Sequence, residues 1–137
     1  MKGWVSSVNV LLYGASCMIL VALVLAWIAT FSKLIVVGPI RDAVKDYHSL
    51  IRAHIDLMLM ALFCLSFFNL HLDLPLVAIY ALVIGGFTNP SLFLLRAFRP
   101  EAGQFPLVRL YRVASFSITS FAFVWVATSI FVRALSR

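Results

Sequence analysis

Long apolar runs constrain this chain more than any other feature. The 137 residues include eleven Lys and Arg and five Asp and Glu, and the runs between them are long enough to cross about 30 Å of hydrocarbon as helix. Apolar residues make up 64% of the chain, against about 45–50% in soluble domains. We therefore expect an all-α integral membrane protein, a four-helix bundle that forms a single transmembrane domain over residues 1–137.

The four spans are expected at approximately residues 4–31, 51–70, 75–95 and 107–133. The first apolar run is too long for the core of a typical signal peptide, so it is assigned to a membrane helix. Trp4 and Trp27 lie near its two ends, where indole rings favour the headgroup layer.

Small residues mark the faces on which the helices are expected to pack. Ala22 and Ala26 form a small-xxx-small pair in the first span, and Ser115, Thr119 and Ala122 recur on one face of the fourth. Such residues allow helix backbones to approach closely in a membrane.

The segment before the second span has the pattern of an amphipathic helix. After Gly38-Pro39, apolar residues at Ile40, Val44 and Tyr47 recur at helical spacing opposite charged residues. This pattern predicts a helix that lies at the membrane interface and runs straight into the second span.

The third span contains the sequence GGFTNP, which is expected to disturb the helix. Pro90 cannot donate a hydrogen bond to the carbonyl of Gly86, and its ring clashes there, so a kinked or broken helix is predicted. The freed carbonyl, beside Thr88 and Asn89, needs a partner within the bundle. Asn89 lies either in a cavity at this point or in a packed interface.

Basic residues are distributed unevenly between the two ends of the spans. Eight flank the first and third loops: Lys33, Arg41, Lys45, Arg52, Arg96, Arg99, Arg109 and Arg112. Three, namely Lys2, Arg133 and Arg137, lie on the other side. The positive-inside rule then places both termini on the non-cytoplasmic side of the cell's inner (cytoplasmic) membrane.

The net charge of +6 forms no single patch, so we expect lipid as the partner and no nucleic acid.

Ionisable residues inside a span are costly and indicate a site by default. Arg52 and Asp56 are four residues apart and can pair on one helix face. His54 points about 200° away from both, so one helix cannot bring His54 and Asp56 to the same metal. A lone neutral imidazole on an apolar face has two interpretations. It is either an axial haem ligand, with basic loop residues paired to the haem propionates, or an interfacial histidine that is hydrogen-bonded to headgroups or a loop.

Other chemistry-bearing patterns are weaker. His71 and Asp73 lie in a tight turn and could bind a cation. The sequence has no Gly-rich phosphate loop, no HExxH, no paired-cysteine motif and no nucleophile elbow.

The order of these features resembles the styrene oxide isomerase and hydroxylaminobenzene mutase group of small four-helix membrane enzymes. The matching residues are Arg52, Ala53, His54, Asn89, Phe98, Pro100 and Gly103. The resemblance covers most of the chain from about residue 50 onward. It implies that His54 is the axial ligand of a haem b near a subunit interface in a homotrimer, with Arg52 beside the cofactor.

The resemblance also implies an activity and a substrate pocket. In the isomerases, ferric haem is a Lewis acid that opens an epoxide before a hydride shift. Asn89 and Asp56 are the candidate catalytic residues, and Asp56 resembles the acidic residue of the mutase branch. Met60 and Phe93 take pocket positions where the family has Asn and Tyr, so two hydrogen-bonding groups are missing. We expect an isomerase or mutase for a small lipophilic substrate, such as an epoxide or a hydroxylamine.

Two other functions are compatible with the sequence. One is a non-catalytic subunit that anchors or assembles a larger membrane complex. The other is an electron-transfer protein in which Met58 or Met60 supplies a second axial ligand to the haem iron.

Overall fold

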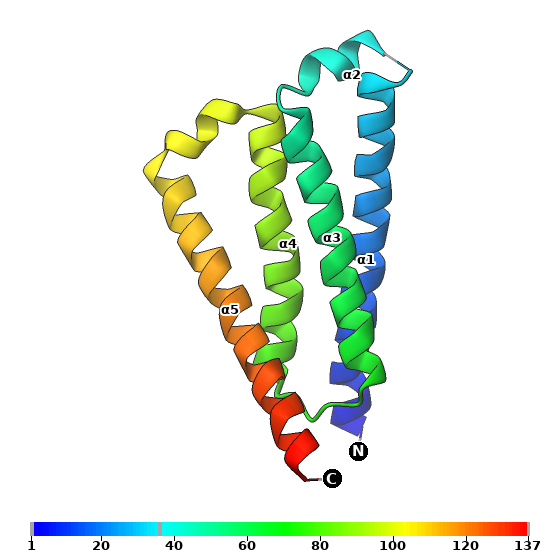
Figure 1. Ribbon diagram of the computed structural model, residues 1–137, viewed down its shortest axis with the longest axis vertical. Coiled ribbons are helices and arrows are strands. Elements are labelled where there is room, and N and C mark those ends of the chain that lie inside the picture. Colours follow the sequence, from blue (N-terminus) through cyan, green and yellow to red (C-terminus); the bar gives the residue numbers. More distant parts are fainter. Residues whose placement is uncertain (1, 36, 137) are drawn as a thin grey trace.

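The chain is helical almost throughout the part that the structure describes. The computed structural model covers residues 2–35 and 37–136, with side chains from Asn9 onward, and these residues include no strand. The elements are α1 (Lys2–Lys33), α2 (Gly38–Ala43), α3 (Tyr47–Asn69), α4 (Leu76–Phe98), the 3₁₀ helix η1 (Pro100–Gln104) and α5 (Pro106–Leu135) (Figure 1). Four of the helices, α1, α3, α4 and α5, are long and apolar enough to span a membrane, which confirms the predicted fold class.

The bundle consists of three central helices and one peripheral helix. α3 packs against both α1 and α4, α1 also contacts α4, and α5 packs against α4 and η1. Large buried side chains such as Met18, Leu57 and Leu82 come from the central three. From α5 the buried apolar side chains are those of Ala122 and Val126. Figure 1 shows the end of α5 next to η1 standing away from α3 and α1. Further along α5, Phe123 packs edge-on against Phe63 and Phe67 of α3.

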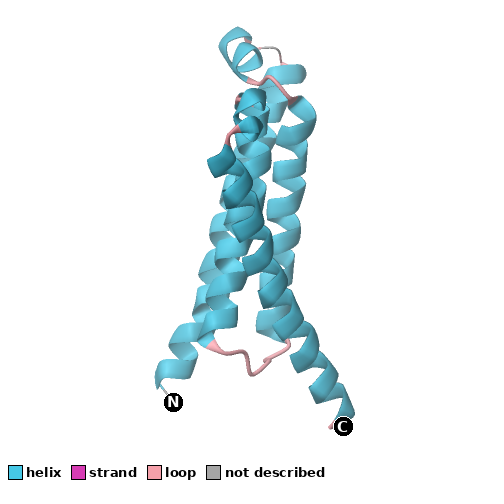
Figure 2. Cartoon of the chain, turned by 90° about the vertical axis from the view of Figure 1, so that its left-hand side faces the viewer, coloured by secondary structure: helices cyan, strands magenta, loops and turns pink. Residues whose placement is uncertain are grey.

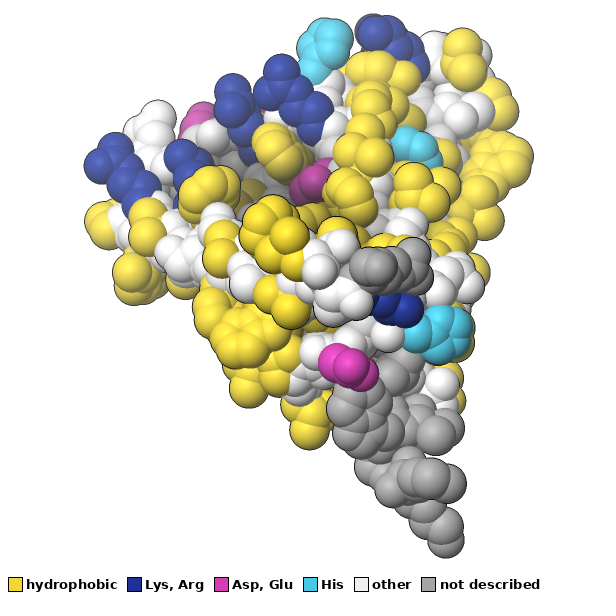
Figure 3. All heavy atoms as spheres, turned by 60° about the horizontal axis from the view of Figure 1, so that its bottom comes forward, with side chains coloured by type: hydrophobic (Ala, Val, Ile, Leu, Met, Phe, Trp, Pro, Cys, Tyr) yellow, Lys and Arg dark blue, Asp and Glu magenta, His cyan; other side chains and the backbone are white. Residues whose placement is uncertain are grey.

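The two ends of the molecule differ in charge and connection. α2 and η1 lie at the same end of the molecule (Figure 1), and the outer ends of α1 and α5 lie at the other, splayed apart (Figure 2). Figure 3 shows Lys and Arg side chains gathered toward the end with α2, and apolar side chains across the middle. The side chains of Lys2 and Trp4, and residue Arg137, lie outside the described part.

The predicted amphipathic helix does not run straight into the second span. Val44 and Asp46 have extended backbones, and α3 begins afresh after Asp46. The carboxylate of Asp46 accepts hydrogen bonds from the backbone N–H of Ser49 at 3.1 Å and from its hydroxyl at 2.7 Å. The backbone N–H groups of Lys45 and Asp46 both donate to the carbonyl of Ala97, at 2.8 and 3.0 Å. An N-cap fixed to α4 thus interrupts the helix.

The cap is charged in the folded protein. The hydrogen bonds from Ser49, first of all that from its hydroxyl, hold the pKa of the Asp46 carboxyl below its ordinary value, and Arg96 adds to the effect. A carboxylate at the first turn is favourable because it faces the positive end of the helix dipole.

Of the predicted kink or break at GGFTNP, the break is wrong, since α4 is continuous from Leu76 to Phe98 with Pro90 inside it. A hydroxyl group supplies a polar partner beside the proline: Ser91 donates to the carbonyl of Thr88 at 2.6 Å. Ser and Thr side chains and neighbouring helices are the means by which membrane helices tolerate proline.

Candidate functional site

His54 is bonded to the backbone of another helix. Its Nδ1 lies 2.8 Å from the carbonyl oxygen of Ala22 in α1. A carbonyl only accepts, so Nδ1 carries the hydrogen and the neutral ring keeps a lone pair on Nε2. Ala22 is fully buried, and its small side chain allows α3 to approach the α1 backbone at this point.

The imidazole lies partly at the surface of the bundle, on the side of α3 that faces α1. His54 is half-buried, whereas Ala53 before it is fully buried. Met58, one turn further along α3, is 43% exposed. The alternative of a histidine bonded to a loop does not apply to Nδ1, whose partner is the α1 backbone.

A separate cleft of about 480 Å³ lies on the other side, between α3, α4, η1 and α5. It is lined by Asp56, Asn89, Leu92, Phe93, Leu95, Arg96, Gly103, Val108, Arg112 and Phe116. The structure therefore brings together three of the expected site residues, Asp56, Asn89 and Phe93. The volume is within the range of about 300–1,000 Å³ that is typical of small-molecule sites.

Met60 does not line this cleft. Its side chain is 4% exposed and belongs to the central core. A Cβ built on Gly86 would lie 3.4 Å from the Cβ of Met60 and closer still to the end of Met18. The end of Met18 thus occupies the space that Gly86 leaves between α1, α3 and α4, and Met60 borders it.

The expected pair between Arg52 and Asp56 is not formed. Among the described residues the one ion pair joins Arg96 Nε to Asp46 Oδ2, at 3.5 Å. Arg52 is exposed, and Asp56 is half-buried in the cleft. Arg52 does not line the cleft that contains Asp56, and holding its long side chain beside Asp56 would cost side-chain entropy.

Asn89 belongs to a hydrogen-bonded network between α4 and α5. Its amide nitrogen donates to Thr119 Oγ1 at 3.1 Å, and its amide oxygen is 2.6 Å from Ser115 Oγ. Ser115 Oγ is also 2.7 Å from Thr88 Oγ1. The Ser115 hydroxyl has one proton, and the amide oxygen can only accept it, so Thr88 donates to Ser115 and Ser115 to Asn89.

Sequence reasoning missed this network and the two arginines of the cleft. Asn89, Phe93 and Arg96 recur at helical spacing, which places them on one face of α4. Ser115 and Arg112 are related in the same way on α5. The sequence shows this spacing within each helix. Which face of α4 packs against which face of α5 depends on the tertiary structure.

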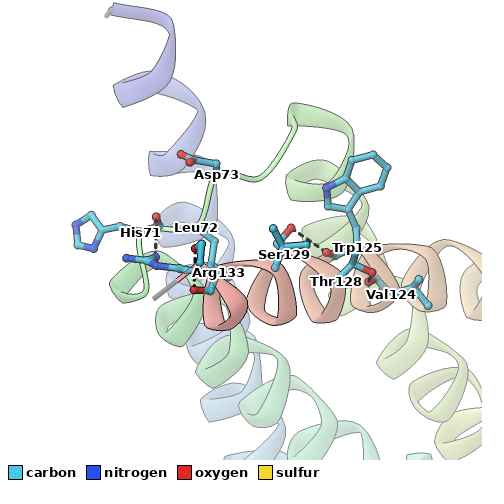
Figure 4. A pocket seen from close by; sticks show the side chains of 10 residues that line it. His71, Leu72, Asp73, Val124, Trp125, Thr128, Ser129 and Arg133 are labelled. Carbon is cyan, nitrogen blue, oxygen red and sulfur yellow. Dashed lines mark hydrogen bonds between the residues drawn. The ribbon is translucent and has the colours of Figure 1, made fainter.

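A second cavity, of about 780 Å³, lies at the opposite end of the molecule, between the α3–α4 loop and α5. Arg133 closes one side by donating to the carbonyls of Leu70 and His71. His71 and Asp73 both line the cavity, but Figure 4 shows their side chains apart from each other. No group of three or more His, Cys, Asp or Glu that could hold a metal is present within the described residues.

The arrangement therefore offers two distinct elements on opposite sides of α3. One is a histidine with a fixed tautomer and a lone pair, and the other is a cleft with a carboxyl, an amide and two guanidinium groups. No protein-family model matches the chain, and no curated protein or solved structure is significantly similar to it.

Proposed function

We propose that this chain is a haem-dependent membrane isomerase or mutase that rearranges a small lipophilic substrate, an epoxide or a hydroxylamine. The observation that carries the proposal is the hydrogen bond from His54 Nδ1 to the Ala22 carbonyl. Metal-bound histidines typically donate their other ring N–H to a carbonyl or carboxylate, which orients the ring and makes the ligating nitrogen more basic.

The residues present fit a haem b group. Axial ligation needs one imidazole nitrogen and no cluster of several ligands, so the lone Nε2 of His54 is sufficient. Arg52 is exposed two residues earlier, at the headgroup end of α3, and would form an ion pair with a haem propionate. Ferric haem would supply a Lewis acid for the oxygen atom of the substrate.

The remaining roles fall to the cleft. Asn89 has one amide N–H beyond its bond to Thr119, and this group would orient the substrate oxygen. Asp56 would hold or move a proton, and Phe93 would contribute an apolar wall. His54 and the cleft of the same chain lie on different sides of α3, so a haem on His54 cannot face that cleft. The site therefore needs a second protomer packed against the His54 face. We accordingly place the cofactor at a subunit interface in a homotrimer, as the family resemblance implies.

The proposal is tested by the absorption spectrum of protein purified after growth with a haem precursor. We expect a Soret band with about one haem per chain, and its loss in His54→Ala. His48→Ala is the matched control, because it removes an exposed histidine six residues earlier on the same helix. A colourless wild-type protein would refute haem binding, and a band that survives His54→Ala would refute the ligand assignment.

Activity distinguishes the isomerase from an electron-transfer protein. Membranes that contain the protein are expected to convert styrene oxide to phenylacetaldehyde, or phenylhydroxylamine to an aminophenol, and Asn89→Ala should reduce the rate. A six-coordinate spectrum that Met58→Leu makes five-coordinate, without any conversion, would instead favour electron transfer. Met60 is too deeply buried to serve as that ligand.

We further propose that the protein resides in the inner membrane with both termini on the non-cytoplasmic side. The eight basic residues named above adjoin the connections α1–α3 and α4–α5, and both lie at the same end of the molecule. This asymmetry is of the kind that sets the orientation of multi-pass proteins.

A further inference from the structure

The chemistry of the cleft between α3, α4, η1 and α5 indicates which molecules it accepts. Along α4 its polar lining residues are Asn89 and Arg96, seven residues apart, which corresponds to about 10 Å along a helix axis. Leu92 and Phe93 lie between them, and Phe116 lines the cleft from α5. The cleft therefore has a basic outer end, an apolar middle and a neutral amide at its inner end.

The outer end has a guanidinium group without a protein partner. Arg112 lines the cleft from α5 and makes no hydrogen bond or ion pair with any described residue. Arg96 is paired with Asp46 through Nε, so its terminal nitrogens are still available to a ligand. Two such groups at one opening favour a carboxylate, because the planar guanidinium matches a carboxylate in geometry and charge.

Asp56 limits what the inner end can accept. This carboxyl group is half-buried at the cleft and has no ion-pair partner among the described residues. Counted from the end of the bundle that carries α2 and η1, Asp56 and Asn89 lie at the same depth, each nine residues from the end of its helix. A ligand is therefore oriented with its acidic group toward the arginines and its uncharged part toward Asp56.

We propose that the cleft binds a single-chain acidic amphiphile, with its carboxylate between Arg96 and Arg112 and its apolar body along Leu92, Phe93 and Phe116. That this amphiphile is the substrate rests on the proposed function, whereas its binding to the cleft does not depend on that function. An epoxide or hydroxylamine that carries a carboxylate about 10 Å from the reacting group is therefore expected to react faster than styrene oxide or phenylhydroxylamine, which carry none.

Binding of dodecanoate to the full-length protein in neutral detergent, followed by native mass spectrometry, tests the proposal. We expect one dodecanoate per chain, and binding weaker by about tenfold or more in Arg112→Ala, since charge-assisted hydrogen bonds are lost. Arg112→Lys should retain part of the affinity. Arg109→Ala is the matched control: it removes the same charge from α5 at a residue that does not line the cleft.

Several results would overturn the proposal. Equal weakening by Arg112→Ala and Arg109→Ala would mean general attraction of anions, and equal binding of dodecanol would mean that no acidic group is recognised. Binding of dioleoylphosphatidylglycerol with the same dependence on Arg112, without binding of dodecanoate, would make the occupant a membrane lipid.

The same titration on His54→Ala separates this inference from the proposed function. Dodecanoate should bind this variant as it binds the wild type, whether or not haem is present. Loss of binding in His54→Ala would contradict a cleft site that is independent of the histidine. A missing Soret band with intact dodecanoate binding would refute the haem function alone.

Discussion

Two polar residues that the sequence marks as candidate ligands or catalysts are held by neighbouring helices in the folded chain. His54 donates to α1, 32 residues away, and Asn89 is bonded to Ser115 and Thr119 of α5. Helical spacing shows that His54 and Asp56 face apart, and the structure bears this out in the separate positions of the two side chains. Spacing could not reveal the partners, because hydrogen bonds between helices depend on how the helices pack.

The network around Asn89 leads to a prediction about stability. Asn89→Ala and Ser115→Ala should each destabilise the protein, and the double variant should cost less than their sum. The coupling should be about 0.6 kcal/mol and at most about 1.7, as for other hydrogen bonds within membranes. Unfolding titrations in mixed micelles would measure it. Additive losses would show that the bond between the two side chains contributes nothing.

That measurement also separates the two roles of Asn89. If the amide acts on substrate, Asn89→Ala lowers the rate well beyond its effect on stability. Ser115→Ala leaves the amide in place and is the control for disturbed packing. Equal loss of rate in both variants would assign Asn89 to helix packing alone.

Among the elements, α4 lies between the α1–α3 pair and α5. It contacts α1, α3 and α5, and it accepts the α3 cap through the carbonyl of Ala97. Proline inside it predicted a break, but the helix continues because tertiary packing overrides a local preference. The start of α3 was missed for the opposite reason. Asp46 and Ser49 form an N-cap at the expected spacing, yet the longer amphipathic pattern favoured one uninterrupted helix.

The neighbouring glycines of α4 permit a matched test of its two contacts. A Cβ on Gly85 would lie 3.1 Å from Thr119 Cβ and 3.2 Å from its backbone Cα, whereas on Gly86 the closest contact is the flexible end of Met18. Gly85→Ala must therefore push α5 away from α4, which costs about 1–3 kcal/mol. Gly86→Ala lets Met18 rotate and gains up to about 1 kcal/mol of helix propensity.

Thermal unfolding in detergent, followed by circular dichroism, would rank the two variants. We expect Gly85→Ala to unfold at a lower temperature than the wild type, and Gly86→Ala to unfold close to it. The reverse order would show that α5 does not pack on α4 at Gly85. Gly38→Ala, where a Cβ would meet nothing within 4 Å, controls for replacing glycine.

For the whole molecule, the sequence specifies four apolar helices but not their arrangement. Periodicity indicates which face of each helix is apolar, and in a membrane both lipid and protein satisfy such a face. The stripe of Ser115, Thr119 and Ala122 on α5 correctly marks its contact with α4, and all three are buried. Nothing in the stripe predicts that α5 meets α3 through Phe123, which packs against Phe63 and Phe67, while the cleft opens between α3, α4, η1 and the first half of α5.

The orientation of the molecule in the membrane is the last prediction, and it depends on charge rather than on packing. Eight basic residues flank the connections at the end with α2 and η1, whereas among the described residues Lys2 and Arg133 belong to the other end. Each cationic residue near a membrane surface favours the cytoplasmic side. Alkaline phosphatase fused after Arg137 should therefore be active and green fluorescent protein dark at the same point, whereas fusions after Gln104 should give the opposite pair. A fluorescent C-terminal fusion would reverse the assignment. The arginines at the opening of the cleft would then face the non-cytoplasmic side, and a carboxylate ligand would approach them from there.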